Sequence, residues 1–413
     1  MNPHGWKLSC ASSWAGLVAE WNRTTVGEVI TLQRGFDITR ATQRAGNVPV
    51  VSSGGVSSFH DTAAVTSPGV VMGRKGTLGK VFYLDCDFWP HDTTLWVKDF
   101  KGNNPRFVYY FLTTLNFLAM DVGSSNPTLN RNHVHPVPIL WPPLLDQNAI
   151  ASVLGALDDK ISSNDRIVDT AERLGSAAFE RYFGCALDCV TTNDQLPDGW
   201  RLSDLGAVSE VIETGRRPKG GVAGIDSGVP SIGAESIIRL GEFDFSKVKY
   251  VPEDFYSKMA RGILKSGDVL VYKDGGRPGD FRPHVSMFGN GYPFERMCIN
   301  EHVYRVRLDR NLGQNFGYYW LSSTPILAEM RRRGTGAAIP GINSTAMKGI
   351  PVVVPPADRL SDFEVFVGPL VNRVLSAASE SRTLATIRDA LLPQLISGKL
   401  RIRDAEQIVE NVV

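Results

Sequence analysis

Cationic and hydroxyl side chains stand beside glycines in several loops of this 413-residue chain. A guanidinium can donate two parallel hydrogen bonds to phosphate oxygens or to guanine O6 and N7, and glycine lets the backbone approach such groups closely. These loops therefore predict contacts with a nucleic acid, although any one of the side chains, taken alone, is also typical of a solvated surface charge. The first half of the chain offers Arg34, Arg40, Ser52, Ser53, Arg74, Lys75, Thr77 and Lys80, and the second half offers Arg216, Arg217, Lys219, Lys273, Arg277, Arg282, Arg331, Arg332 and Arg333. The last three are equally typical of an exposed helix end.

Catalytic motifs break at identifiable positions. The loop Gly73–Lys80 resembles a phosphate-binding loop, but its glycine spacing differs and Val81 stands where a Ser or Thr would bind magnesium. Asn126–Pro127 resembles the start of the Asn-Pro-Pro-aromatic motif of amino-methyltransferases, but Thr128–Leu129 departs from that motif. We therefore expect no catalytic residue and no cofactor bound by this chain. A self-sufficient endonuclease or methyltransferase becomes the least favoured class of function.

Metal-ligand patterns are incomplete as well. His133 and His135 lack an acidic pair at ligand spacing, and Cys185 and Cys189 lack a second Cys or His pair to complete a zinc set. We expect no metal site, and reduced thiols in a cytoplasmic protein. The chain has no apolar run of about 18 residues, so we also expect no membrane-spanning helix.

The net charge of +1 hides a division along the chain. Residues 1–143 carry 12 Lys and Arg against 9 Asp and Glu, and residues 190–356 carry 21 against 18. The segments 144–189 and 357–413 together carry 11 against 16. A chain of this length favours two domains over a single core. The division therefore predicts two mildly basic globular domains, 1–143 and 190–356, and two acidic connecting segments, which is weak support for phosphate binding.

The chain repeats itself. The segment Gly123–Pro143 aligns with Gly336–Pro356, so that Asn130 falls on Asn343 and each segment closes on Pro-Pro. Three further pairs of segments match in the same order. We expect the first two pairs to be strands that run into glycine-bearing loops and the third to be a short helix. They are 48–54 with 229–235, 67–81 with 265–281, and 107–112 with 316–321.

Each repeat is followed by a long stretch with apolar residues at helical spacing, 144–189 and 357–413. Ser361 and Glu364 have the spacing of a capping box, and Pro393 should kink or end the second helix. Two such helices would pack as an antiparallel pair with coiled-coil character. The alternative is two ordinary amphipathic helices, each packed only on its own domain. The residues expected in the helix-pair seam are Ile150, Leu154, Leu157, Ile161, Val168 and Leu174, with Phe363, Phe366, Leu370, Val374, Leu384, Ile387 and Leu391.

Taken together, these segments resemble the specificity subunit of type I restriction-modification systems. The resemblance rests on the openings at Trp21 and Trp200, on the glycine-rich loop GRKGTLGKV, and on the two segments that run into Pro-Pro before a long helix. Its most specific part is ALLPQLISGKLR, within residues 387–402. It extends from about Trp21 to Ile402.

The resemblance implies an α+β fold, with two similar mixed α/β target-recognition domains separated by two long antiparallel helices. It implies a non-catalytic protein that recognises a bipartite site on double-stranded DNA. It also implies two methyltransferase subunits that bind S-adenosylmethionine, and restriction-translocation subunits that use ATP and magnesium. An alternative of another class is a duplicated protein-interaction scaffold that recognises no DNA sequence.

Overall fold

The computed structural model describes residues 21–120, 128–192, 195–336 and 338–412, which form two compact units. One unit comprises Met1–Lys160 with Leu384–Val413, and the other comprises Ile161–Thr383. The two longest helices, α4 (Leu144–Thr192) and α9 (Ala357–Ile396), contribute residues to both units. Residues 123–127 of the predicted repeat, including Asn126–Pro127, lie outside the described residues.

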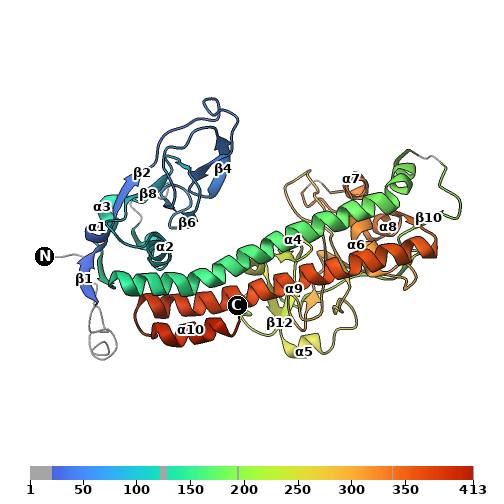
Figure 1. Cartoon of the computed structure of the whole chain (residues 1–413). Coiled ribbons are helices and arrows are strands. Elements are labelled where there is room, and N and C mark those ends of the chain that lie inside the picture. The colour runs from blue at the N-terminus through green and yellow to red at the C-terminus, as the bar shows by residue number, and fades with distance from the viewer. Residues whose placement is uncertain (1–20, 121–127, 193–194, 337, 413) are drawn as a thin grey trace. The chain divides into compact units, whose positions relative to one another are not determined.

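The first unit contains a domain of short strands, which Figure 1 draws in blue. Its central strand, β5, is buried along its whole length, as expected for the β-branched run that the sequence has there. The elements of this domain are β1 (Asn22–Thr25), α1 (Val26–Val29), β2 (Thr31–Arg34), β3 (Val48–Ser52), β4 (Gly55–His60), β5 (Gly69–Gly73), β6 (Val81–Leu84), β7 (Trp89–Pro90), β8 (Thr94–Asp99), α2 (Pro105–Thr113), the 3-10 turn η1 (Phe117–Met120), α3 (Arg131–Val134) and β9 (Pro138–Trp141).

The second unit contains a similar domain with extra elements. The hairpin β13–β14 and its neighbouring turns lie between β12 and β15, where the first domain has only a short turn. The elements are β10 (Arg201–Asp204), β11 (Ser209–Thr214), β12 (Val229–Ile232), η2 (Ala234–Ser236), β13 (Ile237–Arg239), β14 (Glu242–Phe243), η3 (Phe245–Lys247), β15 (Lys249–Val251), α5 (Glu253–Tyr256), β16 (Val269–Tyr272), β17 (Val285–Met287), β18 (Cys298–Ile299), β19 (Val303–Leu308), α6 (Gln314–Ser322), α7 (Thr324–Arg333), α8 (Ser344–Lys348) and β20 (Pro351–Val354).

The strand order confirms the predicted duplication. The first domain has sheets in the orders β2-β8-β5-β6, β4-β3-β7 and β1-β9, and the second has β11-β19-β16-β17, β15-β12-β18 and β10-β20. The equivalence extends to the polar caps, because Asn130 accepts a hydrogen bond from the Asn132 amide at the start of α3 and Asn343 accepts one from Ala346 in α8. The predicted short helices are also present as α2 and α6. The similarity of the two sequence segments therefore reflects a shared scaffold.

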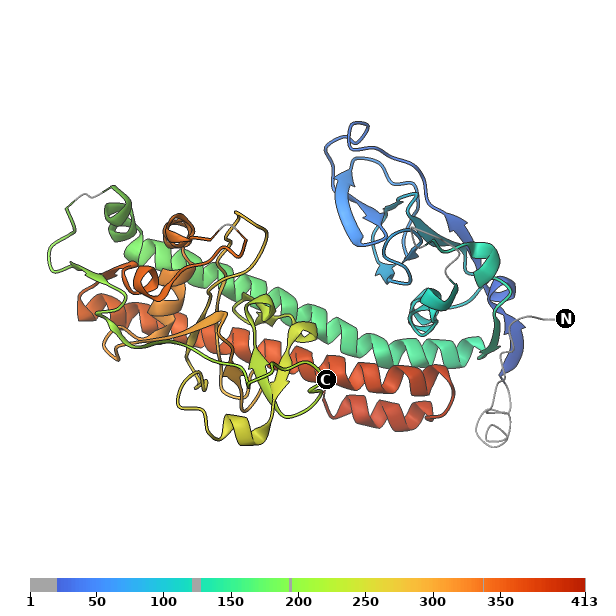
Figure 2. The same ribbon diagram turned by 180° about the vertical axis from the view of Figure 1, so that it is seen from behind.

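The helices α4 and α9 lie side by side in both Figure 1 and Figure 2, and their pairing is antiparallel. In the second unit, the Asn164 amide donates to Glu380 at 2.9 Å, and in the first unit Arg388 donates to Asp158 at 2.7 Å. As the residue number rises along α4, the number of its partner on α9 falls. In the second unit, residues of both helices join one apolar core with the domain, so each helix packs on its partner and on a domain at once.

The stripe predicted for the helix pair is partly displaced. Ile150, Leu154, Leu157, Val168, Phe363, Val374, Leu384 and Leu391 are buried, and Ile161, Leu370 and Ile387 are half-buried. Leu174 and Phe366, however, are 48% and 49% exposed, so their assignment to the seam was wrong. At 3.6 residues per turn the buried face of α9 continues from Phe363 to Val367 and Val371, which turns Phe366 outward.

The ends of α9 also differ from expectation. The helix begins directly after Pro355-Pro356, so Ser361 lies inside it and the predicted capping box is wrong. Glu364 instead accepts a hydrogen bond from the Asn315 amide at 2.6 Å. The helix runs three residues beyond Pro393 and ends before Gly398, whose φ of 67° reverses the chain into α10 (Ile402–Glu410).

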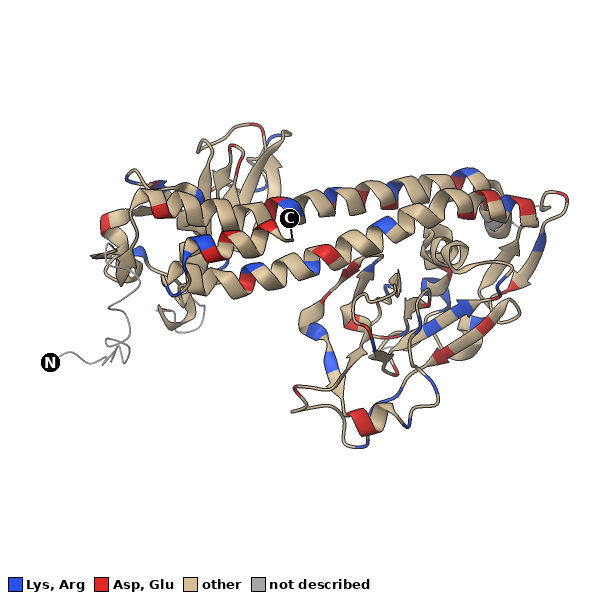
Figure 3. Cartoon of the chain, turned by 60° about the horizontal axis from the view of Figure 1, so that its bottom comes forward, with Lys and Arg blue, Asp and Glu red and all other residues tan. Residues whose placement is uncertain are grey.

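Both signs of charge alternate along α4 and α9, as Figure 3 shows. Such a surface is typical of helices that contact water along one face. Across the described ranges, no helix combines the length and apolar character that crossing a bilayer requires.

Candidate nucleic-acid interface

The four-stranded sheet of the first domain brings three loops to one edge. Strand β8 pairs antiparallel with both β2 and β5, so that Arg34 lies opposite Leu95 and Gly73 lies opposite Thr94. The carboxyl ends of β2 and β5 therefore meet at the amino end of β8. The loops that carry most of the first-domain candidates start from this edge.

Hydrogen bonds hold these loops around the turn before β8. The backbone amides of Arg74 and Lys75 donate to the Thr93 carbonyl at 2.9 and 3.0 Å, and the Ser53 amide donates to the Thr93 hydroxyl at 3.3 Å. Arg34 donates to the Asp92 carboxylate at 2.6 Å. Four residues predicted from separate parts of the sequence, Arg34, Ser53, Arg74 and Lys75, are thus brought together.

The second domain repeats this edge with different side chains. Strand β19 pairs antiparallel with β11 and β16, placing Tyr304 opposite Thr214 and Val303 opposite Tyr272. The Lys273 amide donates to the His302 carbonyl at 3.0 Å, which is the counterpart of the bond from Arg74 to Thr93. A hollow of about 440 Å³ opens here. Its lining includes Glu213, Thr214, Lys273, Asp274, Tyr304 and Asn343.

Close backbone contact at two equivalent glycines sets the course of the loops. A Cβ built on Gly35 would lie 2.2 Å from the His91 carbonyl oxygen, and one on Gly215 would lie 1.6 Å from that of Ile299. Neither distance is tolerable between non-bonded atoms. The glycine at the end of β2 and the glycine at the end of β11 therefore let Arg34, Arg216 and their neighbours lie against the sheet edge.

Ion pairs divide the predicted cations into two groups. Those with an acidic partner are Arg34 with Asp92, Arg217 with Glu301, Lys273 with Asp274, Arg282 with Asp280, and both Arg332 and Arg333 with Glu329. The others form no ion pair within the described part of the chain, and their charge is available to a phosphate. These are Arg40, Arg74, Lys75, Lys80, Arg216, Lys219, Arg277 and Arg331.

The remaining hydroxyl candidates differ in what they contact. The Ser52 hydroxyl donates to the Gly55 carbonyl at 3.0 Å and closes the turn between β3 and β4, which is a structural role. Thr77 is exposed in the loop after β5. The last three predicted cations, Arg331, Arg332 and Arg333, lie in the last turn of α7, where Arg331 donates a hydrogen bond to the Phe281 carbonyl.

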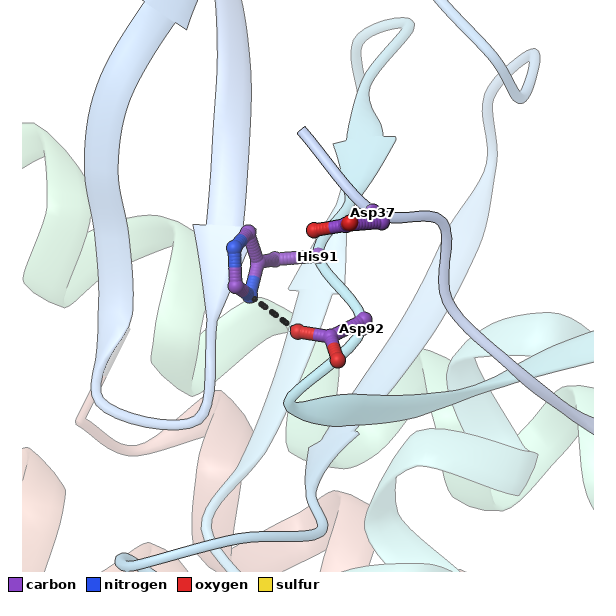
Figure 4. Close-up of side chains that lie close together, drawn as sticks. All are labelled: Asp37, His91 and Asp92. Atoms are coloured by element: carbon purple, nitrogen blue, oxygen red, sulfur yellow. Dashed lines mark ion pairs between the residues drawn. The ribbon is translucent and has the colours of Figure 1, made fainter. Parts of the chain in front are cut away.

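Acidic and histidine side chains at the two edges were not predicted from the sequence. In the first domain these are Asp37, His91 and Asp92, whose candidate ligand atoms lie within 4.8 Å of one another, and Figure 4 shows the three side chains converging. In the second domain they are Asp274, Glu301 and His302; the His302 ring contacts both carboxylates. A signal was available, because Asp92 and Glu301 occupy matching positions two residues before matched strands.

Electrostatics tie the first-domain cluster together. Partial burial raises the pKa of Asp92, but the hydrogen bond from Arg34 and the positive charges of His91, Arg34 and Lys75 outweigh it and leave the pKa lowered. Burial and the nearby charge of Arg34 lower the pKa of Arg74. Asp37, His91 and Asp92 offer ligand atoms of the kind that bind cations, but the Arg34 guanidinium already contacts Asp92. His135, for which the sequence predicted no metal-binding role, accepts a hydrogen bond on its ring from the Leu32 amide at 3.0 Å and serves the fold.

Comparison with known proteins agrees with this architecture. Residues 19–173 match the family described as the type I restriction modification DNA specificity domain. This part of the chain is therefore similar to a type I specificity domain. The resemblance found in the sequence is thereby confirmed. The match covers the first domain and part of α4, and the second domain has the same strand order.

Specificity subunits from other organisms are similar to this chain over most of their length. The MjaIX specificity subunit of a type I restriction enzyme from Methanocaldococcus jannaschii is 22% identical over 314 residues, which cover 72% of this chain and 70% of that one. The StySPI specificity subunit from Salmonella potsdam is 23% identical, covering 79% and 76%. The crystal structure of a type I S subunit from M. genitalium superimposes with a TM-score of 0.59 at 16% identity, over 92% of this chain and 96% of that one. The predicted α+β fold with two domains and two long helices is confirmed.

Proposed function

We propose that this chain is the DNA specificity subunit of a type I restriction-modification complex and that it recognises an asymmetric bipartite site. The observation that carries this proposal is the duplicated sheet edge. Two domains with one topology present loops from equivalent positions, and the side chains on those loops differ. A shared scaffold with different loops suits two half-sites of different sequence.

The charges at the edges support contacts with DNA. In each domain, cations without an acidic partner lie beside cations held by carboxylates. A cation without an acidic partner suits a phosphate, which attracts positive charge whatever the orientation of the side chain. A cation held by a carboxylate suits a base edge, where a fixed guanidinium plane distinguishes one base from another.

The helices supply the spacing between half-sites in this proposal. A helix rises about 1.5 Å per residue, so α4 and α9 are stiff elements whose length is set by sequence, unlike a flexible linker. Inserting one helical turn at matched positions in both helices should therefore change the length of the unread spacer and leave both half-sites unchanged.

Catalysis belongs to other subunits in this proposal. Specificity subunits are non-catalytic, and the catalytic motifs break in this sequence at the positions given above. We infer two methyltransferase subunits that bind S-adenosylmethionine, and restriction-translocation subunits that use ATP and magnesium. This chain would bind none of these cofactors itself. Because the substrate is the cell's DNA, we infer that the complex works in the cytoplasm.

Mapping methylated bases tests the proposal directly. Cells with the chain and its methyltransferase subunits should contain methylation at a two-part asymmetric motif, and cells without the chain should lack it. Exchanging residues 22–141 with residues 201–354 should exchange the two half-sites in that motif. An unchanged motif after the exchange would contradict modular recognition. The scaffold alternative predicts that DNA affinity of the complex does not depend on salt, whereas phosphate contacts make it fall steeply as salt rises.

A further inference from the structure

In both domains, a carboxylate two residues before an equivalent strand contacts an arginine. Arg34 contacts Asp92 at 2.6 Å in the first domain, and Arg217 contacts Glu301 at 3.4 Å in the second. Asp92 and Glu301 precede the equivalent strands β8 and β19. Arg34 is the last residue of β2, and Arg217 lies three residues beyond the end of the equivalent strand β11. The position of the carboxylate is therefore repeated in the fold, whereas the arginine that it contacts comes from a different position in each domain.

The contact leaves part of the Arg34 guanidinium available. Its Nε and one terminal nitrogen face the carbonyl and the carboxylate of Asp92, at 3.4 and 2.6 Å. The edge formed by the two terminal nitrogens still has N–H groups that point away from Asp92. The side chain is 55% exposed. An arginine fixed in this way can donate two hydrogen bonds to guanine without first losing the freedom of a flexible side chain.

The first domain adds a carboxylate that the second domain lacks. Asp37 stands three residues after Arg34, and the residue in the equivalent position of the second domain is Arg217. Asp37 is exposed, and no described side chain forms a hydrogen bond or ion pair with it. Its carboxylate lies within 4.8 Å of an oxygen of Asp92, the residue that holds Arg34.

An exposed carboxylate in this position affects which bases can approach. Phosphates repel it, so it weakens binding to DNA in general. A base amino group is the partner that removes this penalty, and Asp accepts a hydrogen bond from the N4 amino group of cytosine in the major groove. A thymine O4 or guanine O6 at the same place would face it acceptor to acceptor.

We propose that Arg34 and Asp37 together recognise one G·C base pair in the half-site of the first domain. Arg34, positioned by Asp92, donates to O6 and N7 of guanine, and Asp37 accepts from N4 of the paired cytosine. This inference rests on the proposed function and assigns a specific base pair to it. In the second domain Arg217 occupies the position of Asp37 and pairs with Glu301, so its half-site does not require the same combination.

A cation bound by Asp37, His91 and Asp92 is the competing use of these atoms. The Arg34 guanidinium already neutralises Asp92, and Arg74 and Lys75 add positive charge on the adjoining loop. A divalent ion would have to enter against those charges. The surroundings therefore favour a neutral donor such as a base amino group.

The test uses the full chain in complex with its methyltransferase subunits and a DNA library randomised in the first half-site. The variants are Asp37→Ala, Arg34→Ala, Asp92→Asn and Asp37→Asn. The control is Asp85→Ala, which removes an exposed carboxylate from another loop of the same domain. Sequencing of bound DNA gives the preference at every position, and thermal unfolding checks that each variant is folded.

We expect Asp37→Ala and Arg34→Ala to lower discrimination at the same base pair by about 10- to 100-fold, and to leave the second half-site unchanged. Asp92→Asn should weaken the guanine preference at that pair without moving the others, which a purely structural role would not do. Asp37→Asn should admit adenine, because an amide can bond adenine N6 and N7. Asp85→Ala should have no effect on the motif.

Three results would overturn the inference. One is an equal loss of affinity for all sequences in Asp37→Ala, and another is relaxation at different base pairs in the Arg34 and Asp37 variants. The third is saturable binding of Mg²⁺, Mn²⁺ or Zn²⁺ to the wild-type chain, measured by calorimetry and lost in Asp37→Ala, which would assign the cluster to a metal. In each case the wild-type complex would still select a bipartite motif. If the wild-type complex selected no motif, the proposed function itself would fail.

Discussion

Replacing Phe363 with alanine tests whether α9 and α4 share one core within the second unit. Phe363 is fully buried on α9. Its ring centroid lies 5.0 Å from that of Phe183 and 6.0 Å from those of Phe179 and Tyr182, all on α4, and 5.9 Å from that of Tyr319 on α6. One side chain therefore joins three elements.

The expected loss is large. Removing a buried Phe side chain lowers the free energy of unfolding by about 3–5 kcal/mol, because apolar contacts are lost and a cavity remains. All four rings meet Phe363 edge to face with centroids within 6.0 Å, and such pairs add roughly 0.5–1.5 kcal/mol beyond the buried area. We therefore expect a value near the top of that range.

The assay is urea denaturation of the full chain followed by tryptophan fluorescence, since Trp200 and Trp320 lie in this core. The matched control is Phe366→Ala, the same substitution three residues along the same helix at a side chain that is 49% exposed. The control should lower stability by less than about 1 kcal/mol. Equal losses in the two variants would refute the assignment of the seam to Phe363, Val367 and Val371.

Further outcomes follow from individual contacts. Lys75→Ala should weaken DNA binding by the complex equally for all sequences, and should reduce the slope of log affinity against log salt concentration by about 1. The control Lys98→Ala, at the opposite end of β8, should leave that slope unchanged. A change in base preference in Lys75→Ala would contradict a phosphate contact. Gly215→Ala should destabilise the second domain by about 1–3 kcal/mol in thermal or urea unfolding, because the new Cβ would lie 1.6 Å from the Ile299 carbonyl oxygen, whereas Gly54→Ala should be nearly neutral because nothing lies within 4 Å. Burial raises the pKa of Glu172 despite the hydrogen bond from Tyr318. Ionised Glu172 therefore has a higher free energy in the folded chain than in the unfolded chain. This lowers the free energy of unfolding as the pH rises through the pKa that Glu172 has in the unfolded chain. The melting temperature of Glu172→Gln, relative to that of the wild type, should therefore be higher at pH 7 than at pH 4. The opposite order would contradict a raised pKa.

The sequence predicted what depends on local pattern. Repeated segments indicated two copies of one fold, and glycine-bearing loops after apolar runs indicated where strands would end. Helical spacing of apolar residues identified α4 and α9, which begin at or next to the predicted residues. Two of its errors were errors of phase, because a helix rotates by about 100° per residue and Leu174 and Phe366 fall just outside the buried face. The capping box at Ser361 was wrong because α9 begins earlier, at Ala357.

By itself, then, the sequence determined the duplication, the class of fold, the long helices and the loops rich in cations. The grouping of side chains was decided by tertiary structure. Antiparallel pairing of β2, β8 and β5 brings Arg74 and Asp92 to the edge where Arg34 lies, although they are 40 and 58 positions away from Arg34 along the chain. Spacing in sequence carries no information about contacts across strands, so it could not separate cations held by carboxylates from those left for phosphate, nor find Asp37 beside them.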